Sequence, residues 1–180
     1  MIEVSHISKN FKILKRRSGA GGFVKDIFSR EYMTKEAVKD VSFSIEDGEC
    51  IGYIGPNGAG KTTTLRIISG LLKSDGGDLW LDGVRTTKNI LKQKSLIGFV
   101  PDFFGVYENL NVIEYLEFFA ASYGIYGRAG TVRAREVLEM VELSGKEEQM
   151  VDSLSRGIQQ RLCLARAMIH KPKLLVLDEP

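Results

Sequence analysis

The sequence has few cysteines and lacks a long apolar segment. Its two cysteines, Cys50 and Cys163, are not spaced as C-x-x-C, so neither a disulfide framework nor a cysteine metal site is expected. Both are predicted to be small buried hydrophobes in a reducing compartment. No run of 18 apolar residues occurs, and the N-terminus lacks the apolar core of a signal peptide. We therefore expect a cytoplasmic protein that does not itself span a membrane.

The sequence also has little excess charge. A formal net charge of +2 is too small to favour a nucleic acid, so no DNA or RNA partner is expected. With 43% hydrophobic and 27% charged residues, the composition is that of an ordinary globular protein. At 180 residues the chain is long enough to bury a core, and we expect a single domain over residues 1–180.

A glycine-rich segment near residue 55 carries the most specific signal. Residues 55–62 match G-x-x-x-x-G-K-[ST], the phosphate-binding loop that joins a strand to a helix. The apolar run 50–54 predicts the strand, and residues 62–69 predict a short helix that stops at Gly70. The predicted nucleotide-binding residues are Gly55, Pro56, Asn57, Gly58, Ala59, Gly60, Lys61, Thr62 and Thr63.

The residue types of this loop suit a triphosphate. The glycines allow backbone angles at which successive N–H groups point at anionic oxygens, above the positive end of the following helix. Lys61 can reach the β- and γ-phosphates, and the Thr62 hydroxyl is placed to ligate the Mg²⁺ ion that bridges them. The loop therefore predicts binding of a nucleoside triphosphate with Mg²⁺.

Hydrophobic periodicity predicts the remaining elements. Alternation predicts strands from residue 2 to about Phe11, over 41–45 and over 79–81, and short apolar runs predict strands at 97–100 and 174–177, the last buried and parallel. Helical spacing begins after Asp102. We expect a helix from Asn111, capped with Glu114, a second over 131–141 with Val132, Val137, Leu138 and Val141 inward, and a third from Ser155 that ends at Lys171-Pro172.

The segment 15–35 differs in composition from the rest. It holds six basic and two acidic residues around the flexible run 19–22, which marks it as an insertion. Its second half, 23–32, has aromatic and aliphatic residues at helical spacing. A basic amphipathic segment can lie on an anionic membrane or on a partner, and a solvated loop is the common alternative.

Asp178 and Glu179 follow the last apolar strand. In a phosphate-loop ATPase an apolar strand that ends in two acids completes the site: Asp178 would hold Mg²⁺, and Glu179 would orient or deprotonate the attacking water. Alone the pattern is weak, because many strands end in acids. The loop upstream makes the catalytic interpretation specific.

Residues 154–161 supply a third motif and a family resemblance. Leu154, Ser155, Gly157, Gln160 and Arg161 match the signature Leu-Ser-Gly-Gly-Gln followed by polar residues and Arg, whereas Arg156 and Ile158 depart from it. The chain resembles the ATP-binding subunit of an ABC transporter over its whole length. The resemblance implies an α/β phosphate-loop NTPase core with a mixed or parallel sheet, a small antiparallel β portion and an inserted helical subdomain at about residues 102–170.

The resemblance also implies partners. In that family two ATPase subunits face head to tail, and Ser155 and Gly157 of one subunit would point at the γ-phosphate held by the other. The pair binds ATP and hydrolyses it to ADP and phosphate while docked on an integral membrane permease. We therefore expect a peripheral location on the inner face of the cell membrane. Whether Arg156 attracts the phosphate or points to solvent stays open.

Two departures qualify the resemblance, and one detail narrows it to a subgroup. Asp102 stands where the family has a glutamine that touches the metal, and a carboxylate there is a candidate Mg²⁺ ligand. Residues 99–102 and 110–112 look most like the ATPases of ABC-2 type exporters, which favours export. The chain stops at Pro180, before the family's D-loop and switch histidine, so we expect a C-terminally incomplete domain that binds ATP and turns it over poorly.

An aromatic residue is expected to stack on adenine. Counting back from Ala37 places Tyr32 at the position of the family's adenine-stacking aromatic residue, whereas counting forward from the first strand places Phe11 there. Tyr32 is favoured. The rival functions are a soluble GTPase or kinase, which the missing Asn-Lys-x-Asp segment disfavours, a two-cassette ABC ATPase of translation or repair, and a nucleotide-binding module without turnover.

Overall fold

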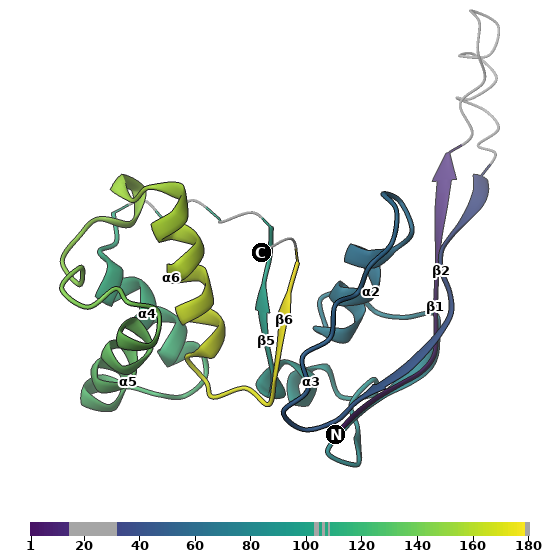
Figure 1. Cartoon of the computed structure of the whole chain (residues 1–180), viewed down its shortest axis with the longest axis horizontal. Coiled ribbons are helices and arrows are strands. Elements are labelled where there is room, and N and C mark those ends of the chain that lie inside the picture. Colours follow the sequence, from purple (N-terminus) through teal and green to yellow (C-terminus); the bar gives the residue numbers. More distant parts are fainter. Residues whose placement is uncertain (15–31, 103–104, 106, 108, 179–180) are drawn as a thin grey trace, which may run out of the picture. The chain divides into compact units, whose positions relative to one another are not determined.

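The computed structural model describes residues 1–14, 32–102, 105, 107 and 109–178. Glu179 and residues 23–31 of the predicted amphipathic segment lie outside the described residues. The chain divides into two compact units, residues 1–89 and 90–180. Most of the helices and strands are labelled in Figure 1.

The first unit is built on an antiparallel sheet of four strands. Their order is β2 (Tyr32–Ile45), β1 (Ile2–Leu14), β3 (Gly76–Leu81) and β4 (Val84–Arg85). Strand β1 pairs with both β2 and β3, so it lies inside the sheet. The buried residues include Ile2, Val4, Ile7, Leu79 and Leu81; they alternate as the sequence pattern predicts, except between Val4 and Ile7, where the pairing with β2 shifts register.

Strands β1 and β2 continue together as a ribbon beyond the rest of the sheet. Prediction ended the first strand near Phe11 and began the second at Val41, whereas pairing reaches the rung Leu14–Tyr32. The outer residue pairs of the ribbon are exposed on both faces. Their sequence therefore lacks the alternation of apolar and polar residues by which a strand is predicted. Strand β2 therefore includes the last four residues of the segment predicted as an insertion.

The prediction of a strand at residues 50–54 is wrong. No described strand pairs with this segment, and strand structure requires such a ladder of hydrogen bonds. Cys50 is exposed, which corrects its prediction as a buried residue. Cys163 is buried as predicted, and burial raises the pKa of its thiol.

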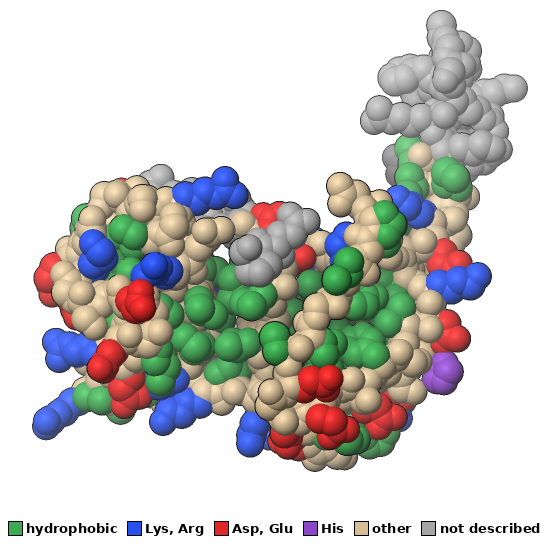
Figure 2. Space-filling model, viewed as in Figure 1, with side chains coloured by type: hydrophobic (Ala, Val, Ile, Leu, Met, Phe, Trp, Pro, Cys, Tyr) green, Lys and Arg blue, Asp and Glu red, His purple; other side chains and the backbone are tan. Residues whose placement is uncertain are grey.

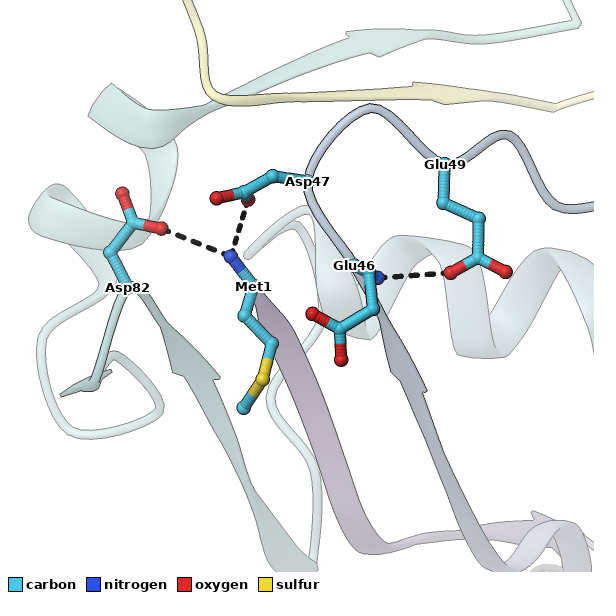
Figure 3. A network of polar contacts seen from close by, with 5 residues as sticks. All are labelled: Met1, Glu46, Asp47, Glu49 and Asp82. Atoms are coloured by element: carbon cyan, nitrogen blue, oxygen red, sulfur yellow. Dashed lines mark hydrogen bonds and ion pairs between the residues drawn. The ribbon is translucent and has the colours of Figure 1, made fainter.

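Polar contacts hold the turn that precedes this segment (Figure 3). The amino group of Met1 lies 2.5 Å from Oδ1 of Asp47 and 3.3 Å from Oδ1 of Asp82. Within the turn the N–H of Glu46 donates to Oε2 of Glu49 at 2.9 Å. The start of β1, the turn at 46–49 and the β3–β4 turn are thereby joined.

The described residues of the second unit form four α-helices, a short 3-10 helix and a parallel strand pair. They are α3 (Ile90–Leu96), β5 (Ile97–Val100), α4 (Val112–Ser122), α5 (Gly127–Met140), the 3-10 helix Val151–Ser153, α6 (Arg156–Met168) and β6 (Leu174–Leu177). Helix α3 was not predicted. The capping box of α4 is confirmed: the N–H of Glu114 donates to Asn111 Oδ1 at 2.9 Å, and the N–H of Asn111 to Glu114 Oε2 at 3.0 Å.

The core of this unit lies between α4, α5 and α6. Its buried residues include Val112, Tyr115, Leu116, Ala120, Ala134, Val137, Leu138, Leu162, Ala165 and Ile169. Val132 was predicted to point inward but is 48% exposed. The buried stripe of α5 runs through Ala134, Val137 and Val141, and a residue two positions before Ala134 lies about 200° around the helix from it.

Helix α6 packs closely on β5. A Cβ atom built on Gly98 would lie 2.3 Å from the carbonyl oxygen of Ala167, so only glycine fits at this crossing. Strand β6 is parallel to β5, as predicted, with Val100 opposite Leu177. The prediction that β6 is buried holds for Val176 only, because Leu175 and Leu177 are partly exposed on the strand's other face.

Candidate functional site

The predicted phosphate loop leads directly into α2 (Lys61–Ile68). Gly58 and Gly60 have φ angles of 82° and 91°, a region that side chains disfavour. The ammonium of Lys61 donates to the carbonyl oxygens of Gly55, at 2.6 Å, and Pro56, at 3.1 Å. The lysine therefore lies back over the loop, with its charge among backbone groups of the segment that a phosphate would occupy.

The end of the loop is pressed against β2. A Cβ atom on Gly60 would come within 2.2 Å of the carbonyl oxygen of Ala37, so only glycine fits there. Gly60 is also the N-cap of α2, which has no side-chain cap hydrogen bond. Thr62 and Thr63 are half-buried in the first helical turn. A helix that begins without a side-chain cap presents its first N–H groups to an anion.

The two aromatic candidates for adenine lie on the same ribbon at different distances from the loop. Phe11 pairs with Lys35, two residues along β2 from Ala37, whereas Tyr32 pairs with Leu14, five residues from Ala37. At about 3.4 Å per residue these separations are roughly 7 Å and 17 Å along the strand. The Lys9 ammonium lies over the Phe11 ring, 5.8 Å from its centroid.

Asp178 and Asp102 lie at the same edge of the second unit's strand pair. Asp178 follows β6 directly, is buried, and donates its N–H to the carbonyl oxygen of Val100 at 2.9 Å. Asp102 comes two residues after Val100 and is exposed. Since the carboxyl ends of parallel strands meet at one edge, the two predicted metal ligands are neighbours there. Glu179, the predicted catalytic residue, is outside the described residues.

Among the described residues no group of three or more His, Cys, Asp or Glu side chains could hold a metal ion by itself. Mg²⁺ does not require such a group, because it is commonly bound by one or two protein oxygens together with phosphates and water. Asp178 and Asp102, both in the second unit, offer the hard oxygen donors that Mg²⁺ prefers. The residues present therefore fit this ion.

The signature residues form the start of α6. Ser155 is the N-cap, and its side chain makes no cap hydrogen bond. Ser155, Arg156 and Gly157 are all exposed, and a Cβ atom on Gly157 would meet nothing within 4 Å. Leu154, just before them, is buried and anchors the turn. The helix thus presents its positive end and an unengaged cap side chain at the surface.

The other end of α6 is held by Arg133 of α5, which sequence reasoning missed. This buried guanidinium donates from Nε to the carbonyl oxygen of Ile169 at 2.9 Å and from Nη2 to that of Met168 at 2.6 Å. Its third contact, with Glu136 at 2.8 Å, lowers the pKa of that carboxyl group. The available signal was its position in the inward stripe, one residue before Ala134 and four before Val137.

Comparison with known proteins decides the family. The family model described as ABC transporter matches residues 38–180, more than three quarters of the chain. The chain belongs to the ABC transporter family. This confirms the resemblance.

Curated relatives in this family include export proteins. Over 151 residues, 84% of the chain, it is 40% identical to the linearmycin resistance ATP-binding protein LnrL of Bacillus subtilis and 38% identical to the Nod factor export ATP-binding protein I of Burkholderia orbicola. These matches cover 49% and 50% of the two relatives. The chain thus spans about half the length of the curated relatives it matches.

Solved ABC cassettes share the fold. A dimeric ATP-binding cassette in a post-hydrolysis state, bound to ADP and phosphate, matches with a TM-score of 0.77 and 27% identity over 98% of this chain and 73% of that one. A dimeric bacterial ABC transporter cassette matches with a TM-score of 0.77 and 24% identity over 100% of this chain and 88% of that one. The predicted fold class, a phosphate-loop NTPase cassette, is confirmed. In the described residues no helix is long and apolar enough to cross a membrane.

Proposed function

We propose that this protein is the ATP-binding and hydrolysing subunit of an exporter, and that it powers transport through a separate membrane permease. The observation that carries the proposal is the loop at 55–62, where Lys61 covers the backbone carbonyls and Gly60 packs on Ala37. A loop held in this form binds the β- and γ-phosphates of ATP through its N–H groups and the lysine.

We assign the metal ligands and the catalytic residue from the same proposal that the loop binds ATP. Thr62 and Asp178 would hold Mg²⁺, with Asp102 beside Asp178 as a further oxygen ligand. The ion supplies neutralisation of charge that develops on the phosphates. Glu179, next to Asp178 in the sequence, would orient or deprotonate the attacking water.

The aromatic that stacks on adenine is Phe11 in this proposal. The register that separates Phe11 from Ala37 by two residues supports it over Tyr32, which lies five residues away. This reverses the preference drawn from counting back along the sequence. The intervening residues 33–36 belong to a paired strand, so they extend the ribbon and carry Tyr32 away from the loop.

The assembly would be a head-to-tail pair of subunits on a permease, at the inner face of the cell membrane. The uncapped, exposed start of α6 at Ser155 and Gly157 supports this arrangement, because it suits a γ-phosphate presented by a second subunit. In this proposal residues 1–180 form one nucleotide-binding domain with a helical subdomain at about 102–170.

The test is an ATP-Mg²⁺ titration of the parent and of Lys61→Ala, with Lys73→Ala as the control for an exposed lysine of the same unit. We expect Lys61→Ala to abolish binding and Lys73→Ala to leave it unchanged. Equal affinity in all three proteins would overturn the assignment. Phosphate release that disappears in Glu179→Gln indicates an ATPase, whereas ATP binding with no release in the parent indicates a module without turnover.

A further inference from the structure

The outer end of the β1–β2 ribbon carries apolar side chains that are exposed in the described part of the chain. We name residues 12–14 and 32–35 the ribbon tip. Its apolar side chains, Ile13, Leu14, Tyr32 and Met33, are between 40% and 56% exposed. Figure 2 shows apolar side chains gathered at this end of the ribbon. An exposed apolar cluster on a two-stranded ribbon is unfavourable in water and marks an interaction site.

The apolar residues occupy both faces of the ribbon tip. Ile13 pairs with Met33, and the next rung pairs Leu14 with Tyr32. Because side chains of directly paired residues share a face and successive residues alternate, the first pair lies on one face and the second on the other. A flat protein surface could cover only one of these pairs. A medium that surrounds the tip can cover both.

The charge around the ribbon tip is positive. Lys12 and Lys35 are exposed within it, one on each strand. Residues 9–35 contain eight basic and two acidic residues, whereas the remainder of the chain contains 17 basic and 21 acidic ones. The positive charge is therefore concentrated in the sequence segment 9–35, although the overall net charge is only +2. Such a segment is attracted to an anionic surface.

We propose that the ribbon tip binds anionic lipid directly, with Ile13, Leu14, Tyr32 and Met33 among the headgroups and Lys12 and Lys35 against the lipid phosphates. Apolar residues on both faces, combined with a local excess of cations, favour a bilayer surface over a protein groove. The apolar residues of the ribbon tip do not include Phe11 or the phosphate loop, although Lys35 is the strand partner of Phe11. It gives the subunit a membrane contact that does not depend on a permease.

The experiment is flotation of the full 180-residue chain with vesicles of phosphatidylcholine, with or without phosphatidylglycerol. We expect binding to the phosphatidylglycerol vesicles only. Raising the salt from about 0.1 M to 1 M shortens the screening length from about 10 Å to 3 Å, so it should release most of the protein.

Three variants locate the contact. Lys12→Gln with Lys35→Gln should weaken vesicle binding roughly fivefold per lysine. Ile13→Thr with Met33→Thr, which keeps strand-compatible residues, should weaken it roughly tenfold. The matched control is Val132→Thr with Met140→Thr on α5, where the two side chains are 48% and 61% exposed and lie outside the ribbon. The control should bind vesicles as the parent does.

Binding that is equal on uncharged vesicles, or that survives both ribbon-tip variants, overturns the proposal. So does the absence of binding by the parent. If the ribbon-tip variants float as the parent does but no longer co-purify with a membrane protein, the occupant is a protein. The Lys61→Ala variant should still float, so failure of ATP binding and failure of lipid binding are read separately.

Discussion

The Nε atom of Arg133 donates a hydrogen bond to the carbonyl oxygen of Ile169 at 2.9 Å, within the buried core of the second unit. A helix leaves its last carbonyl oxygens without partners inside the helix. Here a charged side chain of α5 satisfies two of them, so the C-terminal end of α6 is fixed on its neighbour.

Replacing this arginine should therefore destabilise the protein. Arg133→Met retains much of the volume but removes the donor from the Ile169 carbonyl oxygen and leaves that of Met168 with the Lys171 N–H alone, which we expect to cost roughly 1 to 3 kcal/mol. Urea unfolding monitored by circular dichroism measures the loss. Arg135→Met, at an exposed position of the same helix, should change stability by about 0.5 kcal/mol or less. Equal losses would show that Arg133 does not act through the carbonyls.

Gly60→Ala should disrupt the phosphate loop. The new methyl group would meet the Ala37 carbonyl oxygen at 2.2 Å, and φ is 91°, so strain and overlap both act. We expect ATP affinity to fall by more than about tenfold and stability by roughly 3 kcal/mol. Gly48→Ala separates the two effects, because Gly48 has φ of 79° but open space around it, and it should lose only about 1 kcal/mol. Similar results for the two variants would contradict the close contact.

Phe11→Ala should weaken ATP binding by roughly 1 to 2 kcal/mol, by analogy with bases stacked on aromatic side chains in nucleic-acid complexes. Tyr32→Ala should have no such effect, because Tyr32 lies five residues from Ala37 along β2. Lys35, the strand partner of Phe11, lies only two residues from Ala37. Competition with a fluorescent ATP analogue measures both. A loss confined to Tyr32→Ala would restore the assignment drawn from sequence.

His170 should make stability depend on pH. Its ring stacks on Tyr123 with centroids 4.0 Å apart, and Nε2 contacts the Ile97 carbonyl oxygen at 3.2 Å. Burial lowers its pKa from 6.5, and in the described part of the chain Nδ1 is buried without a hydrogen-bond partner. The folded state therefore takes up this proton less readily than the unfolded state.

This difference in the pKa of His170 determines the direction in which stability changes with pH. The stabilisation from the neutral ring is complete above the unfolded pKa of 6.5 and is lost as pH falls below it toward the lower folded pKa. We expect the parent to lose stability from pH 7 to about pH 5.5, and His170→Asn to lose less over the same range. Urea midpoints across this range measure it, and identical slopes for the two proteins would refute the prediction.

Elements whose signal is local could be predicted from the sequence. Helices α4 and α6 followed from their apolar periodicity and cap residues, and the phosphate loop followed from its glycines and lysine. The length of the β1–β2 ribbon and the lack of a strand at 50–54 depend on which segments pair across the fold. Pairing is a long-range property that hydrophobic alternation does not encode when both faces are exposed.

In the candidate site, too, some residues could be predicted from local sequence and others only from the structure. Lys61 and Asp178 belong to motifs that are recognisable from consecutive residues. That Asp102 lies beside Asp178 follows only from the parallel register of β5 and β6, in which Val100 is opposite Leu177. The choice of Phe11 over Tyr32 likewise required the contact between Gly60 and Ala37.

Helix α6 crosses β5 at Gly98, so a tilt of the helix would pivot about this contact. Ala167 rests on Gly98, and Ser155 lies twelve residues away along the helix, about 18 Å at 1.5 Å per residue. A tilt of roughly 5° at the crossing would swing Ser155 by about 1.6 Å, and a misplacement of about 1 Å can cost roughly a hundredfold in rate. The close contact at Gly98 therefore controls how accurately Ser155 is positioned at the other end of α6.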